Sequence, residues 1–243
     1  MNKKPVITVL YHIFYEDSCH DICLELKPLA VYQPHFLFNI CLETPDKIAM
    51  CKMLRNNFPG CFIIFTSNKG KDIGAKLALF QCLFELEINP DYVLLLHDKK
   101  SLQALKSKTW KKELLKIVSP DMIVLIMDLF QKNEDIGIIG TKEYIIKEPF
   151  VNNRFTDLNG NHIGNLLDDY QIKIDSFKFI AGTMFWARAR PFNDFFTRHN
   201  TLDIRKNLEN GNIIDNFSGT VTHSWERLLT WIVTSNGYSI KGI

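Results

Sequence analysis

The fold of this chain is indicated most clearly by the stretch Tyr92-Val93-Leu94-Leu95-Leu96-His97-Asp98-Lys99-Lys100-Ser101. Its uninterrupted apolar run predicts a strand buried on both faces, which is typical of the inner strands of a parallel sheet. The run ends abruptly in an imidazole, a carboxylate and two ammonium groups. Because ligands of an open α/β sheet bind beyond the carboxyl ends of its strands, we expect these side chains to meet a phosphate or a metal, the alternative being a solvated strand end.

Short apolar runs alternate with amphipathic segments along most of the chain, which predicts parallel strands joined by crossover helices. The expected architecture is therefore an α/β fold whose Rossmann-type, mostly parallel sheet is flanked by helices. Further strands are predicted at Val6–Tyr11, Phe36–Leu42, Cys61–Phe65 and Ile136–Ile139.

Helices are predicted in the gaps between these strands. Thr44 is the expected N-cap of a helix over Pro45–Asn57, and Gly70 precedes a helix over Lys71–Leu86. A third helix, over Asp121–Gln131, is apolar enough to be buried on more than one side.

The second half of the chain has a looser pattern. The polar stretch Glu143–Asp175 is rich in Asn and Gly and predicts a surface insertion. An apolar block over Phe177–Trp186 follows, with a strand expected across Ala181–Arg188, and a last helix is expected from Thr222 to Gly237. No repeat or hinge-like linker interrupts the chain, so residues 1–243 are expected to form a single domain.

The composition is typical of a packed globular protein, with 46% hydrophobic residues, 23% charged residues and 18 phenylalanines. A net charge of +2 is too small to indicate a nucleic-acid partner, which would need basic charge gathered on one face. Lysines do gather in one stretch whose only acid is Glu113, and this stretch should either attract anions or form a solvated face. They are Lys99, Lys100, Lys106, Lys108, Lys111, Lys112 and Lys116.

The cysteines and the apolar runs bear on location. All six cysteines lie in the first third of the chain, several in apolar runs where a reduced thiol behaves as a small hydrophobe, which favours a cytoplasmic protein. The first apolar run is already interrupted by Tyr11 and His12, so it is not a convincing signal peptide. No later apolar stretch approaches the roughly 20 residues of a membrane-spanning helix.

A second group of polar and small residues follows the strand predicted at Cys61–Phe65. The turn Asn68-Lys69-Gly70-Lys71-Asp72-Ile73-Gly74 combines two glycines, which let backbone approach a ligand, with a helix N-terminus whose free N–H groups suit anions. Its spacing matches neither the P-loop nor the dinucleotide fingerprint, so a plain strand-to-helix turn explains it equally well. We expect this turn to face His97–Ser101 across adjacent parallel strands.

Four blocks of the sequence together resemble the rhamnan synthesis F family of bacterial polysaccharide glycosyltransferases. They follow the family's order over nearly the whole chain, and they are Tyr11-His12, Asn68–Gly74, Leu96–Ser101 and the pair formed by Ala181–Arg188 with Thr222–Arg227. The resemblance implies a GT-A-like fold and transfer of rhamnose or another hexose from a dTDP- or UDP-sugar. The acceptor would be a cell-surface polysaccharide or lipopolysaccharide, free or lipid-linked, reached by peripheral contact with the inner face of the membrane.

The resemblance also assigns provisional roles. Residues 1–140 would hold the nucleotide sugar, and residues 141–243 would hold the acceptor and the catalytic groups. The expected acceptor-binding residues are Gly182, Thr183, Trp186 and Arg188. The expected donor-binding residues are Tyr11, His12, Asn68, Gly70, Lys71, Asp72, Gly74, His97, Asp98, Lys99 and Lys100.

One departure concerns metal. GT-A enzymes carry an Asp-x-Asp motif that holds a divalent ion on the donor diphosphate, whereas this sequence has His97-Asp98-Lys99 at the equivalent place. Asp98 with help from His223 could still bind Mg²⁺ or Mn²⁺. Alternatively Lys99 and Lys100 supply the positive charge that a departing diphosphate needs, and we favour this second account.

The last helix supplies the expected catalytic base, Glu226. With Thr222 as cap, His223 and Glu226 stand three residues apart on one face near the helix N-terminus, where the dipole favours a carboxylate. By resemblance Glu226 corresponds to the acceptor-activating carboxylate of inverting GT-A enzymes, with His223 next in line. The alternative for this residue is a Glu226 that merely pairs with Arg227 or caps its own helix. The alternative for the whole chain is a non-catalytic module that binds an anionic ligand such as a nucleotide or phospholipid headgroup.

Overall fold

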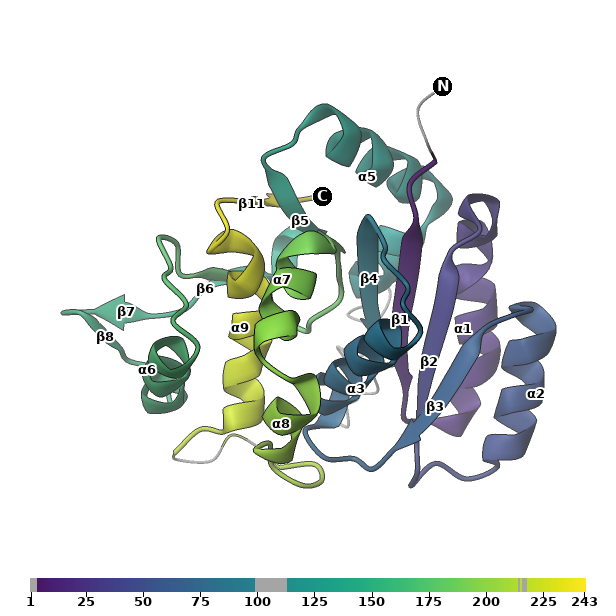
Figure 1. The fold of residues 1–243 in the computed structure, drawn as a ribbon, viewed down its shortest axis with the longest axis horizontal. Coiled ribbons are helices and arrows are strands. Elements are labelled where there is room, and N and C mark those ends of the chain that lie inside the picture. Colours follow the sequence, from purple (N-terminus) through teal and green to yellow (C-terminus); the bar gives the residue numbers. More distant parts are fainter. Residues whose placement is uncertain (1–3, 99–112, 214, 216–217) are drawn as a thin grey trace.

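The computed structural model describes residues 4–98, 113–213, 215 and 218–243, and a seven-stranded sheet runs through them (Figure 1). The strand order is β11-β5-β10-β4-β1-β2-β3, with β10 antiparallel to its two neighbours and every other pairing parallel. The predicted α/β class with a mostly parallel sheet is confirmed. The strands of this sheet are β1 (Ile7–Ile13), β2 (His35–Cys41), β3 (Phe62–Thr66), β4 (Tyr92–His97), β5 (Ile136–Gly140), β10 (Phe185–Arg188) and β11 (Ser239–Gly242).

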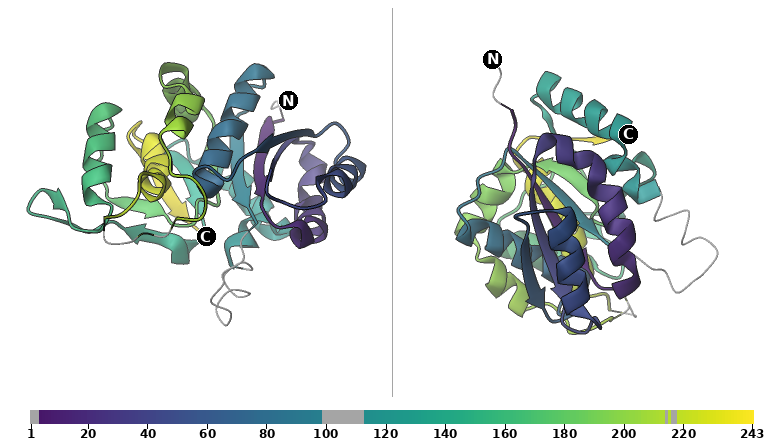
Figure 2. Two further views of the ribbon diagram at one scale, coloured as in Figure 1. Left: turned by 90° about the horizontal axis from the view of Figure 1, so that it is seen from below. Right: turned by 90° about the vertical axis from the view of Figure 1, so that its right-hand side faces the viewer.

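Helices cover both faces of the sheet (Figure 2), because alternate strand residues are apolar on both sides. One face of the sheet packs on α1 (Cys19–Leu26), α2 (Lys47–Asn57), α5 (Pro120–Lys132) and the 3-10 turn η3 (Leu115–Val118). The opposite face packs on α3 (Lys71–Glu85), α6 (Gly160–Asp169), α7 (Arg190–Arg198), α8 (Thr201–Lys206) and α9 (Val221–Thr234). None of the helices in the described ranges is long and apolar enough to cross a membrane.

Two details of the predicted helices are wrong. The helix α2 is capped by Asp46, whose side chain accepts from the Ala49 N–H, because Thr44 instead donates its hydroxyl to the Phe14 carbonyl. The helix α5 buries a single face, since Val124 is 62% exposed while Ile126 is fully buried.

The polar stretch after β5 has more structure than predicted. It contains the 3-10 turn η4 (Lys142–Tyr144), the strand β6 (Ile145–Lys147), the hairpin of β7 (Phe150–Val151) with β8 (Arg154–Phe155), and α6. The strand β6 pairs with β9 (Lys178–Ile180), so this segment is built onto the domain rather than looped out from it.

The single strand predicted across Ala181–Arg188 is also wrong, because its first residues form a sharp turn between β9, which ends at Ile180, and β10, which begins at Phe185. Gly182 has φ +81° and Thr183 has φ +48°, values that an extended strand does not adopt. The turn sends β10 antiparallel between β4 and β5, and β11 joins β5 from the other side. The two halves expected from the sequence therefore share one sheet.

Candidate functional site

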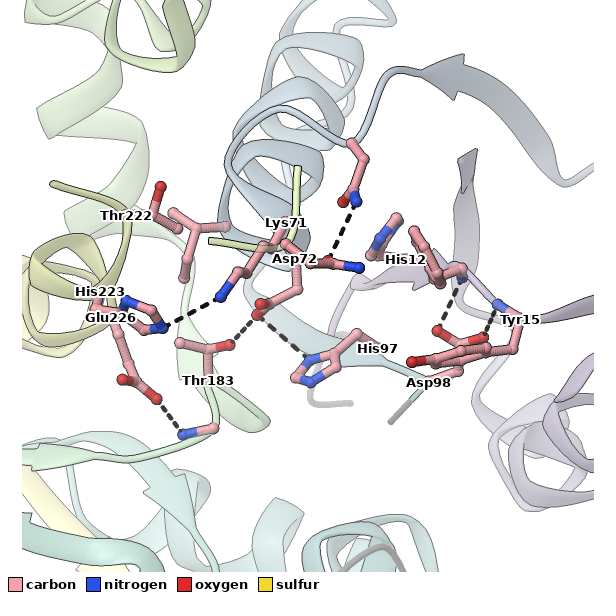
Figure 3. A pocket seen from close by; sticks show the side chains of 15 residues that line it. His12, Tyr15, Lys71, Asp72, His97, Asp98, Thr183, Thr222, His223 and Glu226 are labelled. Atoms are coloured by element: carbon pink, nitrogen blue, oxygen red, sulfur yellow. Dashed lines mark hydrogen bonds and ion pairs between the residues drawn. The ribbon is translucent and has the colours of Figure 1, made fainter. Parts of the chain in front are cut away.

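A pocket of about 230 Å³ opens at the carboxyl ends of β1 and β4, between the N-termini of α3 and α9 (Figure 3). The turn before β10 also reaches it, since β10 runs antiparallel and begins at this end of the sheet. Ten of the residues predicted to form the site line it, namely His12, Asn68, Lys71, Asp72, His97, Asp98, Gly182, Thr183, His223 and Glu226. Five further lining residues were not predicted, namely Phe14, Tyr15, Ile73, Asn212 and Thr222.

The Asn68–Gly74 turn reaches the pocket by a different route from the one predicted. The strands β3 and β4 are not adjacent, because β1 and β2 lie between them. The helix α3 packs across β1 and β2, and its first turns bring Asp72 and Lys76 to the end of β4. The segment after α8 holds the turn in place, since the Glu209 carbonyl accepts from the Gly70 N–H and the Asn68 amide donates to Asn212 Oδ1.

A buried charge cluster forms the floor of the pocket. Lys76 has no exposed surface, and its Nζ lies 2.9 Å from Asp72 Oδ2 and 3.1 Å from His97 Nδ1. The Thr183 hydroxyl accepts from Lys76 and donates to Asp72 Oδ2 over 2.7 Å. Burial alone would raise the pKa of Asp72, but the charges of Lys76 and His97 together with these hydrogen bonds hold it well below the usual value. Asp72 is therefore an ionised carboxylate.

The turn over Gly182 and Thr183 is held from two sides. Glu226 Oε1 accepts from the Gly182 N–H over 2.6 Å, while Asp72 and Lys76 hold the Thr183 hydroxyl. A β-branched residue at φ +48° is strained and persists only where its surroundings determine it. Such strained residues gather at functional sites, and Lys71 at φ +51° is a second one in this pocket.

The α9 side of the pocket carries an imidazole with a carboxylate partner. His223 Nδ1 lies 2.8 Å from Asp215 Oδ1 and 2.6 Å from the Thr220 hydroxyl. His223 Nε2 lies 3.4 Å from the Lys71 ammonium across the pocket. The predicted cap was wrong, because Thr220 caps α9, whereas the backbone and hydroxyl of Thr222 donate to the Glu209 carboxylate.

Asp98 and His223 do not form the metal site considered from the sequence. The two oxygens of Asp98 accept from the backbone N–H groups of Phe14 and Tyr15, at 2.8 and 2.7 Å. His223 lies at the opposite side of the pocket from Asp98 (Figure 3), so the two side chains do not converge on one ion. Within residues 4–98, 113–213, 215 and 218–243, no three His, Cys, Asp or Glu side chains are grouped to hold a metal. Asp98 and His223 therefore do not fit the Mg²⁺ or Mn²⁺ site that was the less favoured of the two accounts.

His12 is a buried, neutral imidazole at the end of β1. Burial lowers its pKa to about 4, although the Asp72 carboxylate acts in the opposite direction. Its Nδ1 lies 2.9 Å from the Asn39 side-chain amide. His12 thus contributes hydrogen-bonding atoms rather than charge to the pocket.

Three predicted donor-binding residues lie outside the pocket. Tyr11 has no exposed surface and packs with Phe38 in the core on the α1 side. Gly70 and Gly74 are glycines for packing reasons, since a Cβ on them would collide with Leu208 and with the Lys69 carbonyl respectively. The absence of a Cβ at these two positions lets the turn close.

Two predicted acceptor-binding residues, Trp186 and Arg188, also lie outside the lining of the pocket. Trp186 is fully buried and donates its indole N–H to the Ile117 carbonyl, so it offers no stacking face. Arg188 pairs with Tyr92, the first residue of β4, so it lies at the amino end of β4, opposite the end at which the pocket opens. There its guanidinium donates to the Ile136 and Phe130 carbonyls.

Lys99, Lys100 and the lysine-rich stretch as far as Lys112 lie outside the described residues.

Three residues that shape the site were missed. Lys76 follows Asp72 by four residues on a helix, and a lysine amid the apolar run that continues to Leu83 is a signal that could have revealed a buried ion pair. Asp215 and Glu209 act on α9 from loops, and no local pattern marks them.

A model of the rhamnan synthesis protein F family matches residues 1–238. The chain belongs to this family. Two proteins named "Uncharacterized protein WxcX", from strains B100 and ATCC 33913 of Xanthomonas campestris pv. campestris, are each 26% identical to it over 183 residues. The match covers 72% of this chain and 24% of each relative, so the chain spans about a quarter of their length.

Among solved structures, the apo form of mouse xyloside xylosyltransferase 1 aligns with 98% of this chain and 85% of its own. Its sequence identity is 9% and its TM-score is 0.33, too low to support a conclusion about this member of the rhamnan synthesis protein F family.

Proposed function

We propose that the chain is a glycosyltransferase of the GT-A type that moves a hexose from a nucleotide-diphosphate sugar to a glycan acceptor in surface polysaccharide synthesis. Membership of the rhamnan synthesis protein F family supports the reaction class. The observation that carries the proposal is the pocket itself, where the N-terminus of α3 with Lys71 faces the imidazole and carboxylate of α9. One side suits an anionic leaving group and the other suits deprotonation of a hydroxyl.

The diphosphate would lie against the first turn of α3. Backbone N–H groups at a helix N-terminus attract anions, and the Lys71 ammonium adds a charge that strengthens as the diphosphate departs. The donor is a dTDP- or UDP-sugar, with the sugar directed toward Gly182 and Thr183. The acceptor hydroxyl approaches from the α9 side, where His223 and Glu226 are the two candidate bases, and a direct displacement inverts the anomeric configuration.

A donor panel tests this proposal. The chain is incubated with dTDP-rhamnose, UDP-glucose, UDP-galactose and GDP-mannose, and release of nucleoside diphosphate is followed together with thermal protection. We expect protection and slow hydrolysis with at least one dTDP- or UDP-sugar. Saturable nucleotide binding without hydrolysis or transfer would instead support the non-catalytic anion-binding module.

A further inference from the structure

We infer that Asp215 and His223 act as a dyad in which His223 is the general base and Asp215 is a positioning residue. The inference rests on the proposed glycosyl transfer and names the group that activates the acceptor. Asp215 Oδ1 lies 2.8 Å from His223 Nδ1, and both side chains are about a quarter exposed. The Thr220 hydroxyl lies 3.2 Å from the same carboxylate oxygen and steadies it.

Three contacts of His223 bear on the position of its proton. The Thr220 hydroxyl, 2.6 Å from Nδ1, donates its own proton to Asp215 Oδ1 and therefore accepts from Nδ1. An ionised carboxylate only accepts hydrogen bonds, so Nδ1 carries the proton that points at Asp215. A lysine ammonium only donates, so the facing Nε2 carries a lone pair toward Lys71. A carboxylate on one imidazole nitrogen and a lone pair directed at the substrate side on the other is the arrangement by which a histidine accepts a proton in hydrolases.

Lys71 does not block this lone pair. Its Nζ is 3.4 Å from Nε2, which is at the outer limit of a hydrogen bond. A donor diphosphate bound at the N-terminus of α3 competes for the same ammonium through a stronger, charge-assisted contact. An acceptor hydroxyl can then take the place of Lys71 at Nε2.

Both carboxylate oxygens of Glu226 already accept hydrogen bonds from other groups of the protein. Its Oε1 holds the Gly182 N–H, and its Oε2 accepts from Arg227 Nη1 over 3.0 Å. Arg227 is itself anchored by the buried Glu148, at 2.9 Å. Moving the Glu226 carboxylate toward a substrate would release the strained Gly182–Thr183 turn, whereas His223 can accept a proton without moving any backbone.

The transfer moves one proton and one electron pair. The acceptor oxygen forms a bond to the anomeric carbon while its proton passes to His223 Nε2. The bond between that carbon and the diphosphate oxygen breaks, and its electron pair leaves with the diphosphate. The imidazolium that results is stabilised by the Asp215 carboxylate until the proton returns to water.

The tautomer of His223 is tested first, by long-range ¹H–¹⁵N correlation NMR on the full chain, with the His223→Gln variant identifying the signal. We expect the Nδ1–H form in the parent and a shift toward the Nε2–H form in Asp215→Asn. This measurement needs no substrate, so it tests the Asp215–His223 dyad independently of the proposed glycosyltransferase activity. An Nε2–H form in the parent would overturn the inference.

Donor hydrolysis then tests the role in catalysis, using whichever sugar nucleotide of the panel the parent hydrolyses fastest. General-base assistance contributes on the order of 10²-fold or more, so we expect at least about a 100-fold loss in His223→Gln with UDP affinity unchanged. Asp215→Asn should lose activity in parallel with its change of tautomer, and Glu226→Gln should lose less than either. Parental rates in His223→Gln, or a larger loss in Glu226→Gln, would make Glu226 the base. Absence of hydrolysis in the parent would remove the proposed function, and this assignment with it.

Discussion

The hydroxyl of Thr183 donates to Asp72 Oδ2 over 2.7 Å, and this bond attaches the turn before β10 to the first turn of α3. Lys76 donates to the same hydroxyl, so the Thr183 side chain joins both partners of the Lys76–Asp72 ion pair. Replacing Thr183 by Val would leave these charged groups short of one partner, at a cost of about 1–3 kcal/mol in the free energy of unfolding. Thr183→Ser keeps the hydroxyl and is the control, and it should lose much less in urea unfolding. Equal losses in the two variants would contradict the assigned bond.

The complete burial of Lys76 leads to a second prediction. Lys76→Met removes the cation from a side chain with no exposed surface and leaves Asp72, whose side chain is 24% exposed to the pocket, without its ammonium partner, so we expect a loss of about 1–3 kcal/mol in the free energy of unfolding. In the double variant Lys76→Met/Asp72→Asn the remaining charge is also removed, so we expect part of the lost stability to return. Strictly additive losses in a double-mutant cycle would show that the pair is not coupled.

The buried His12 makes stability depend on pH. An unfolded histidine binds a proton below about pH 6.5, whereas folded His12, with its pKa lowered to about 4, stays neutral until about pH 4. Because the unfolded state binds more protons in this window, stability falls as the pH falls from 6.5 to 4, by on the order of 3 kcal/mol in total. Asp72, with its depressed pKa, contributes a loss that begins at about pH 5 and falls mostly below this window. Urea midpoints against pH should show a flatter slope between pH 4 and 6.5 in His12→Gln, and an unchanged slope would contradict the assignment.

The sequence was sufficient for the strands β1 to β5 and for the four long helices α2, α3, α5 and α9, because apolar periodicity reports burial directly. The strand predicted at Tyr92–Leu96 lies within β4, and the helix predicted at Lys71–Leu86 corresponds to α3. The turn at Gly182 was missed because the apolar run on either side is continuous. Its left-handed backbone is imposed by Asp72 and Glu226, which are distant in sequence.

The candidate site was recovered where strand ends and a helix N-terminus mark it, as at His97 and Lys71. Trp186 and Arg188 were misassigned because antiparallel insertion of β10 reverses which end of the strand meets the pocket. The partnership of Asp215 with His223 joins a loop to a helix, and no residue spacing encodes it.

The hydrogen bonds of Asp98 lead to a prediction about metal dependence. Since its two oxygens already accept from the backbone of Phe14 and Tyr15, we expect donor hydrolysis to persist in EDTA at close to the untreated rate. The control is the same preparation with added Mn²⁺ or Mg²⁺, which should give little stimulation. Complete loss in EDTA, restored by either ion, would return a divalent metal to the mechanism.

The central claim is that the pocket between α3 and α9 holds a nucleoside diphosphate against Lys71, and calorimetric titration of UDP and dTDP tests it most directly. A charge-assisted hydrogen bond contributes about 1.5–3 kcal/mol, so Lys71→Met should weaken binding by roughly 10- to 100-fold. Lys69→Met is the matched control, because Lys69 contacts Asn210 outside the lining of the pocket, and it should bind like the parent. Failure of the parent to bind either nucleotide, or equal affinities in the parent and in Lys71→Met, would contradict the account.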